Sequence, residues 1–301
     1  MTCAVAVPSA APHDRAMSVD DADERVAETA LVDRAVAGDR SAVTEVVRLL
    51  QDPLYRLALR MTGNPSDAED AVQEILLRAV GNLASWRGEA KLTTWAYRIG
   101  VNYLLNQRRR SPQESALLDL DGFGANLLEG LAEQEYRGPE ATVLTREVRL
   151  VCSQAMLQCL ARDERVAFVL ADVFELSSAE AAWILGIGAA AYRKRLERAR
   201  TRLGNFLDST CGVANPAAPC RCSRRVRTAV DQGRVRPGRP GLAGHPVTPG
   251  GRSAADAEAQ MAGLHDAASI LRAHPDYALP PARLEAIATL LDSGRFPLLD
   301  R

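Results

Sequence analysis

Apolar residues recur every three or four positions through most of the chain, which is the spacing of an amphipathic helix. The clearest stripe lies within residues 66–83 and consists of Val72, Ile75, Leu76, Ala79, Val80 and Leu83. Comparable stripes occupy residues 43–50, 54–61, 92–103, 143–170 and 192–203, with Pro53 separating the first two. Aromatic residues make up only 5% of the chain. Since Ala, Leu and Val supply most of the apolar side chains, the pattern predicts an all-α fold.

Breaks in this pattern divide the chain into six segments. Helical periodicity fills residues 29–110 and 141–207, which we interpret as two domains of a 301-residue protein. Residues 1–28 lack periodicity and are expected to form a disordered arm. Residues 111–140 and 208–252 are rich in Ser, Pro, Gly and charged side chains, and both are predicted to be linkers. Residues 253–301 predict a C-terminal extension of two short helices.

The most distinctive pattern lies in residues 177–207. A short helical stretch is followed by Gly186, Ile187 and Gly188, and then by a long basic helix. Two helices around a short glycine-containing turn are typical of a helix-turn-helix, with the second helix in the major groove. That helix has an apolar stripe through Tyr192 and Leu196, and its other sides carry six Arg or Lys side chains within ten residues. Such a cationic flank suits phosphate contacts, although a solvated basic face would look similar.

A second candidate surface combines aromatic and basic residues between positions 84 and 110. Aromatic faces beside cations suit unstacked single-stranded bases. Trp95 and Tyr103 fall on the apolar stripe and are expected in the core, which leaves Trp86 and Tyr97 as the candidates for base contact. The preceding helix carries Asp70, Gln73 and Glu74 on its polar side. Such an acidic face is either solvated or docked on a basic partner.

Charge is unevenly distributed although the net charge is only −1. Residues 18–75 hold thirteen acidic and six basic side chains, whereas residues 186–240 hold thirteen basic and three acidic ones. This asymmetry favours polyanion binding by the second region. No stretch approaches the roughly 20 apolar residues of a membrane helix, and the N-terminus lacks a basic signal-peptide region. We therefore expect a cytoplasmic protein with no membrane segment.

Nothing in the sequence indicates catalysis. The four histidines are scattered, and the common nucleophile, zinc-protease and phosphate-loop motifs are missing, so we expect neither an enzyme nor a cofactor. Cys211, Cys220 and Cys222 follow the basic helix. Zinc normally takes four ligands, and His245 is a distant candidate for the fourth. Reduced thiols in a basic turn and a metal or redox site both remain open.

Three strings, in this order, resemble one known family. They are DAEDAVQEILLRAV at residues 67–80, WRGEAKLTTWAYRIGVNYLLNQRRR at 86–110 and ELSSAEAAWILGIGAAAYRKRLERARTRL at 175–203. Together they are similar to bacterial RNA polymerase sigma factors of the extracytoplasmic-function (ECF) group. The cysteine-containing string CGVANPAAPCRCSRRV at 211–226 resembles a tail that follows some of these factors.

The resemblance implies that residues 29–110 are sigma region 2, which binds RNA polymerase core and the minus-ten element. Residues 141–207 would be sigma region 4, a helix-turn-helix that reads the minus-thirty-five element. Asp70, Gln73 and Glu74 would bind polymerase. The implied DNA-binding residues are Trp86, Arg87 and Lys91 in a loop, Tyr97, Arg98, Asn102, Asn106, Arg108 and Arg109 on the minus-ten helix, and Tyr192, Arg193, Lys194, Arg195 and Arg198 on the recognition helix.

The resemblance also implies the partners: RNA polymerase core, promoter DNA and, as a further candidate, an anti-sigma factor. Residues 189–191 are three alanines where the family commonly has a Pro and a Gly-Thr-Val-type stretch, and alanine cannot hydrogen-bond base edges. Two other functions stay open. One is a helix-turn-helix regulator that works without polymerase, which would leave residues 84–110 unexplained. The other is a metal- or thiol-sensing DNA-binding protein.

Overall fold

The structure is a computed structural model that describes residues 19–107, 119–261 and 266–291. Within these ranges every regular element is a helix, and β-type pairing is limited to two isolated bridges, Cys211 with Cys220 and Val247 with Tyr277. The predicted all-α fold is confirmed.

The first helical bundle consists of α1 (Val19–Val36), α2 (Arg40–Thr62), α3 (Pro65–Gly81) and α4 (Leu92–Asn106). Asp39 caps α2 by accepting hydrogen bonds from two backbone N–H groups, and α2 ends at Gly63, whose φ of 85° is left-handed. Asn64 then caps α3, with Pro65 in its first turn. α1 begins at Val19, so the predicted disordered arm is too long: its last ten residues are helical.

α2 continues through Pro53, where the sequence pattern suggested a break. Proline removes one backbone donor from a helix interior, which normally costs about 3 kcal/mol. Leu50, Leu54 and Leu57 are all fully buried on either side of it. Burial of this continuous apolar stripe offsets the lost hydrogen bond.

The second set of helices begins with α6 (Leu120–Glu129), which lies inside the predicted linker. Its apolar face packs on the long basic helix, where the rings of Phe123 and Phe206 stack 5.6 Å apart. α7 (Ala141–Gln158) and α8 (Arg162–Phe168) follow, and α8 continues into a π-helical turn at Val169–Val173. α9 (Ser178–Leu185) and α10 (Ala189–Thr210) complete the set.

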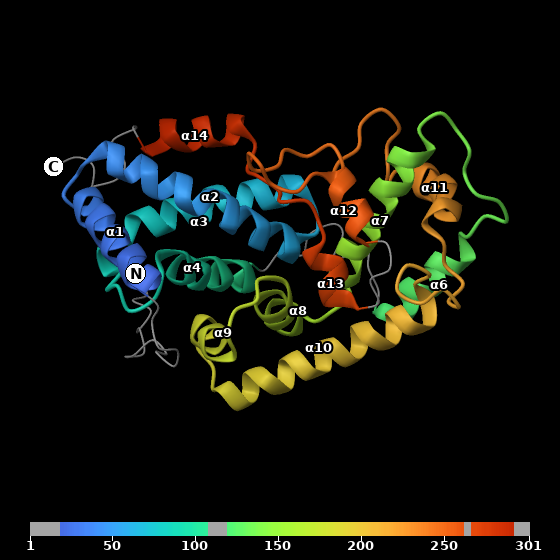
Figure 1. The fold of residues 1–301 in the computed structure, drawn as a ribbon, viewed down its shortest axis with the longest axis horizontal. Coiled ribbons are helices and arrows are strands. Elements are labelled where there is room, and N and C mark those ends of the chain that lie inside the picture. The colour runs from blue at the N-terminus through green and yellow to red at the C-terminus, as the bar shows by residue number, and fades with distance from the viewer. Residues whose placement is uncertain (1–18, 108–118, 262–265, 292–301) are drawn as a thin grey trace.

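The remaining chain is also helical in part. α11 (Cys222–Asp231) lies in the second predicted linker and packs on α7. Beyond it, α12 (Ala254–Met261), α13 (Ala267–Arg272) and α14 (Pro281–Leu291) replace the two helices predicted for the extension. We call residues 241–291 the C-terminal segment. Figure 1 shows it crossing from α7 to the first bundle, with α14 lying along α2 and α3.

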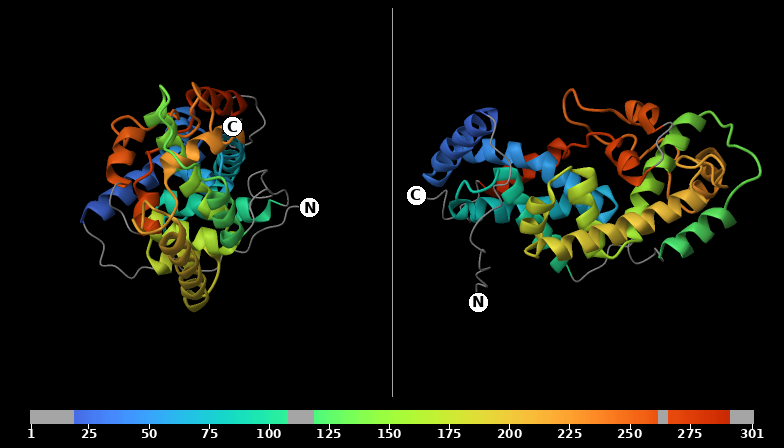
Figure 2. Two further views of the ribbon diagram at one scale, coloured as in Figure 1. Left: turned by 90° about the vertical axis from the view of Figure 1, so that its right-hand side faces the viewer. Right: turned by 60° about the horizontal axis from the view of Figure 1, so that its bottom comes forward.

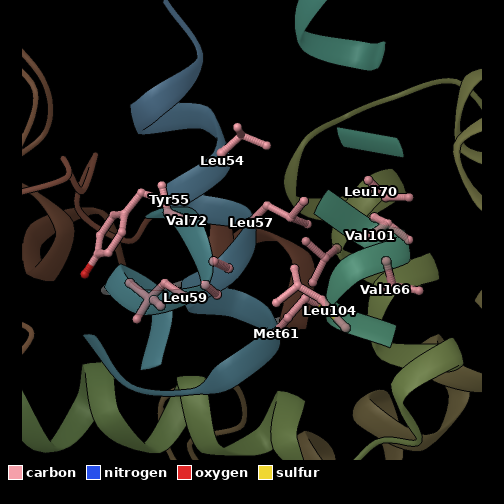
Figure 3. Close-up of a cluster of buried hydrophobic side chains, with 14 of the residues drawn as sticks. Leu54, Tyr55, Leu57, Leu59, Met61, Val72, Val101, Leu104, Val166 and Leu170 are labelled. Carbon is pink, nitrogen blue, oxygen red and sulfur yellow. The ribbon is translucent and has the colours of Figure 1, made fainter. Parts of the chain in front are cut away.

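The two predicted domains share one hydrophobic core. Figure 3 shows Met61 of α2 and Leu104 of α4 facing Val166 of α8 and Leu170 of the π-helical turn. α10 runs along the outer side of this assembly, as the second view in Figure 2 makes clear. The second set of helices is therefore packed on the first bundle rather than held apart from it.

Candidate nucleic-acid interface

α9 and α10 form the helix-turn-helix predicted from the sequence. Ser177 and Glu180 cap α9 reciprocally: the Ser177 hydroxyl accepts from the Glu180 N–H at 3.2 Å, and the Glu180 carboxylate accepts from the Ser177 N–H at 2.9 Å. Gly186 ends α9 in the left-handed conformation, with φ 64°. These local signals fix the sharp change of direction that leads into α10.

The inner face of α10 is core. Tyr192 has no exposed surface, and its hydroxyl donates a hydrogen bond to the carbonyl oxygen of Ala167 at 3.0 Å. Burial raises the pKa of the Tyr192 phenol. The assignment of Tyr192 to DNA contact is therefore corrected: it lies on the same stripe as Leu196, Ala199 and Leu203, which face the protein.

The outer face of α10 divides its basic residues into two groups. Arg193 and Lys194, near its N-terminus, are exposed. Arg195 lies 3.5 Å from the Asp163 carboxylate, and Arg198 lies 2.9 Å from that of Glu164. Arg200 forms a similar ion pair with Asp172, and Arg202 forms one with Glu164. The cationic surface that remains directed outward is thus concentrated at the start of α10, where a recognition helix enters the major groove.

The predicted minus-ten helix, α4, faces the helix-turn-helix. Arg98 donates a hydrogen bond to the carbonyl oxygen of Trp183 in α9 at 2.6 Å, and its guanidinium lies 4.8 Å from the centre of the Trp183 ring. Tyr97 stacks on Phe174 at 5.3 Å, and burial raises the pKa of its phenol to about 12. In this arrangement neither side chain is available to a DNA base, because the second set of helices occupies that face.

The other candidates on and after α4 differ in exposure. Asn106 is exposed and Asn102 is half-buried. Arg108 and Arg109 lie outside the described residues. The polar edge at the end of α4 is therefore the part of the predicted minus-ten surface that stays accessible.

The loop of residues 86–91 precedes α4. Trp86 is only 8% exposed, and its indole N–H donates a hydrogen bond to the carbonyl oxygen of Ala90 at 3.0 Å. The ring is thus part of the core, which corrects its assignment to base stacking. Lys91 forms a 2.6 Å ion pair with Glu24 of α1, whereas Arg87 is exposed. Arg87 is the loop side chain best placed to meet DNA.

The acidic face of α3 is covered in part by the C-terminal segment. Arg283 of α14 lies 2.9 Å from the Glu69 carboxylate and 3.1 Å from that of Asp70. Glu74 pairs with Arg78 one turn further along α3, at 2.7 Å. Asp70, Gln73 and Glu74 were predicted from the sequence to bind polymerase, whereas the ion pair of Glu69 with Arg283, more than 200 positions away, was not predicted.

The C-terminal segment is anchored more deeply at its beginning. The buried Glu147 carboxylate of α7 accepts hydrogen bonds from the backbone N–H groups of residues 241, 242 and 243, at 2.6–3.1 Å. His245 then stacks on Tyr55 of α2, with ring centres 5.1 Å apart. Asp52, also on α2, accepts from the Leu279 N–H at 3.0 Å. The segment therefore bridges both sets of helices.

A buried polar cluster lies between α2, α7 and α13. Arg60 donates to His274 Nδ1 at 2.9 Å and to the carbonyl oxygen of Leu271 at 2.9 Å. Because a guanidinium only donates, Nδ1 accepts, so the neutral imidazole carries its proton on Nε2 and donates it to the Ser153 hydroxyl at 2.7 Å. Burial, followed by the charge of Arg60, holds the pKa of His274 well below its usual value.

The cysteine candidates lie away from these surfaces, at the far end of α10. His245, the suggested fourth ligand, is committed to Tyr55 and to the carbonyl oxygen of Ala278. Across the described ranges, no three His, Cys, Asp or Glu side chains are arranged to hold a metal ion.

Comparison with known protein families identifies the class of protein to which the chain belongs. The Sigma-70 region 2 family matches residues 46–112, and the Sigma-70 region 4 family matches residues 150–203. The chain is thus a sigma-70-type transcription initiation factor, and its relatives define the group. The ECF RNA polymerase sigma-E factor of Escherichia coli K12 is 33% identical over 187 residues, which cover 60% of this chain and 95% of that protein. The chain belongs to the ECF sigma factors.

A second relative agrees. The ECF RNA polymerase sigma factor SigW of Bacillus subtilis is 33% identical over 168 residues, covering 55% of this chain and 89% of SigW. Among solved structures, CnrH in complex with the cytosolic domain of CnrY aligns with 97% of its own chain and 62% of this one, at 24% identity and a TM-score of 0.41. In the described part of the chain, no helix is long and apolar enough to span a membrane.

Proposed function

We propose that this ECF sigma factor binds RNA polymerase core and directs promoter-specific, DNA-templated transcription initiation, and that its own C-terminal segment holds it in a closed form. The observation that carries the closed form is the contact of Arg283 with Glu69 and Asp70. Asp70 belongs to the acidic face that the family resemblance assigns to polymerase. A side chain that already neutralises this carboxylate competes with a basic partner for it.

The division of labour follows the two family matches. Region 2, proposed at residues 29–110, would bind polymerase through α3 and the minus-ten element through α4. Region 4, proposed at residues 141–207, would bind the minus-thirty-five element through α10. Arg193 and Lys194 are exposed where phosphates would approach, which supports a backbone-contacting role. A regulator that works without polymerase would need only region 4. The match to Sigma-70 region 2 therefore argues against such a regulator.

Opening of the closed form would have to precede promoter melting. Arg98 and Tyr97 are occupied by Trp183 and Phe174, so α4 can present them to DNA only after the second set of helices moves. Duplex binding by the start of α10 does not require that movement. The closed form would therefore restrict polymerase docking and strand opening more than contact with the minus-thirty-five element.

The remaining parts of the proposal concern setting and partners. The protein would act in the cytoplasm, where polymerase and chromosome are found, and by binding rather than by catalysis. An anti-sigma factor that used the acidic face of α3 would have to displace α14. Inhibition from within and inhibition by a partner would then be alternatives at the same surface.

Run-off transcription tests the proposal. Bacterial core polymerase at limiting concentration is combined with the full-length chain, or with a chain truncated after Leu279, on a library of promoter fragments. We expect specific transcripts from both proteins and more from the truncated one, which lacks α14. Failure of both to direct specific transcripts would contradict the sigma function. Equal activity at every core concentration, with a native circular dichroism spectrum, would contradict the closed form alone.

A further inference from the structure

The loop of residues 86–91 lies against α1, the helix that replaces the end of the predicted disordered arm. Lys91 forms its 2.6 Å ion pair with Glu24 of α1. Gly88 is left-handed, with φ 70°, and a Cβ atom at this position would lie 3.9 Å from the Thr29 hydroxyl oxygen. The loop therefore contacts α1 at its middle and at its end.

Glu28, one helical turn after Glu24, makes the most buried of these contacts. It is only 6% exposed, and its Oε2 accepts a hydrogen bond from the N–H of Leu92 at 3.0 Å. Leu92 is the first residue of α4. The first N–H groups of a helix have no partner within the helix, and they carry partial positive charge. Glu28 thus supplies an acceptor and a negative charge to the start of α4.

The start of α4 has no cap of its own. Lys91, which precedes the helix, makes no side-chain capping hydrogen bond, and the first turn contains no acidic residue. A serine or aspartate at this position would cap the helix locally, without burying a distant carboxylate, which is costly. Burial raises the pKa of Glu28, while the hydrogen bond from Leu92 lowers it. What Glu28 adds, and a local cap would not, is attachment of the loop to α1.

This attachment fixes the backbone from which Arg87 projects. Trp86 anchors the other end of the loop, since its ring lies in the core and its indole N–H donates to the carbonyl oxygen of Ala90 at 3.0 Å. Arg87 lies between the two anchored ends and is exposed. A side chain on a backbone that is already ordered loses less entropy on binding than one on a free loop.

We infer that Glu28 is a positioning residue for DNA binding. By holding the loop of residues 86–91 and the start of α4 on α1, it fixes the direction in which Arg87 meets promoter DNA, without touching the DNA itself. The inference rests on the proposed function, in which this loop contacts the promoter. It gives α1 a role that the Sigma-70 region 2 match does not indicate, because that match begins only at residue 46.

A double-mutant cycle between Glu28 and Arg87 tests the inference. The full-length chain is combined with saturating core polymerase, and its affinity is measured by fluorescence anisotropy on a promoter fragment that directs a specific run-off transcript. Arg87→Ala should weaken binding about fivefold or more, and Glu28→Ala should also weaken it. The double variant should bind as Arg87→Ala does, because Glu28 acts through Arg87. Additive losses would overturn the inference.

Two further variants separate positioning from a general loss of stability. Asp52→Ala is the matched control: burial also raises the pKa of Asp52, and this carboxylate accepts one backbone N–H, from Leu279 at 3.0 Å, away from the loop. It should leave promoter affinity unchanged. Glu28→Gln keeps an oxygen that can accept from Leu92, so it should recover most of the affinity lost in Glu28→Ala. An equal loss in Asp52→Ala, or no recovery in Glu28→Gln with a native circular dichroism spectrum, would overturn the inference.

Hydrogen exchange keeps the inference testable if Glu28→Ala fails to fold. The Leu92 amide should exchange slowly in the wild-type chain, with or without DNA, and rapid exchange would overturn the contact. Unchanged promoter affinity in Arg87→Ala would also overturn the inference, because the loop would then not contact DNA. A wild-type chain that directs no specific transcript would contradict the proposed function itself, and the inference would fall with it.

Discussion

The C-terminal segment is held in different ways at its two ends. Its root comprises residues 241–243 and His274. The buried Glu147 carboxylate accepts three backbone N–H groups there, and Arg60 and Ser153 enclose the buried imidazole. Its tip is α14, whose Ile287 and Leu291 side chains are buried in the core and whose Arg283 forms ion pairs with Glu69 and Asp70 of α3. Asp70, one of the two carboxylates, is 66% exposed. A buried charge with several hydrogen bonds is costly to uncover, whereas an exposed ion pair contributes little.

This difference indicates where opening begins. Release of the tip breaks the Arg283 ion pairs and exposes Ile287 and Leu291, but it leaves no charge buried without a partner, so the tip can uncover the acidic face while the root stays attached to α7. Release of the root would expose unpaired backbone donors and an imidazole without partners. We therefore expect α14 to control access to polymerase, and the root to control overall stability.

The largest effect is expected from Glu147→Ala. The substitution leaves the buried N–H group of Leu242 and the partly buried N–H groups of Gly241 and Ala243 without their acceptor, so the free energy of unfolding should fall by about 2–3 kcal/mol. Urea unfolding measures the loss, and hydrogen exchange at residues 241–243 locates it. The control is Glu140→Ala, since Glu140 accepts one exposed N–H, from Gly238 at 3.0 Å. If both variants lost a similar free energy of unfolding, the hydrogen bonds of the root would contribute no more to stability than an exposed hydrogen bond.

The second prediction concerns pH. The pKa of His274 is lowered in the folded protein, so the unfolded chain takes up the proton first as the pH falls below about 6.5. The stability that the neutral imidazole contributes is thus complete above that pH and falls by up to about 1.4 kcal/mol per pH unit below it. His274→Gln should reduce this dependence between pH 6.5 and 5.

The comparison with His274→Gln is needed because other groups also change stability as the pH falls. Burial also lowers the pKa of His245, which adds a change of the same sign. The carboxyl pKa values of Glu28 and Asp52 are raised by burial, so these groups change stability in the opposite direction. An unaltered slope in His274→Gln would show that the imidazole is not enclosed as the root requires.

The fold could be predicted largely from apolar spacing, because helices that bury one face carry that spacing whatever they pack against. The boundaries between helices and linkers were harder to predict. α6 has Leu120, Phe123 and Leu127 at helical intervals, but Gly122 and Gly124 between them weaken the signal. α11 is short and carries several arginines, so it looked like a linker until its contact with α7 was known.

The candidate site could be predicted only in outline. Apolar spacing can identify Tyr192 as core, since it shares a stripe with Leu196. It cannot reveal that Tyr97 meets Phe174, because that contact depends on how two sets of helices pack. Arg283 and Glu69 illustrate the same limit, since ion pairs between distant segments leave no local pattern.

At the tip, the third prediction is loss of function. Asp70→Arg places a positive charge on the face proposed to bind polymerase, and it also breaks one Arg283 ion pair. If polymerase needs this carboxylate, core binding should fall about tenfold, corresponding to about 1.4 kcal/mol, even though α14 is loosened. Fluorescence-detected binding to core polymerase measures the change. The exposed control Asp208→Arg lies on α10 and should bind core normally.

The smallest effect is expected from Arg283→Glu. This variant distinguishes the contact of α3 with α14 from the proposed contact of α3 with polymerase. This variant loses both ion pairs and repels Glu69, but leaves intact the carboxylates that we propose bind polymerase. Ion pairs at the surface contribute roughly 0.2–1 kcal/mol. Asp70 is exposed and Glu69 is half-buried, so core binding should rise by up to about fivefold while the unfolding midpoint hardly moves. Arg272→Glu is the matched control, since Arg272 makes an exposed ion pair with Glu175, away from α3. An increase in both variants would indicate a general charge effect. A decrease with Arg283→Glu would mean that α14 helps polymerase to bind, and the tip would then be a positive contact rather than a cover.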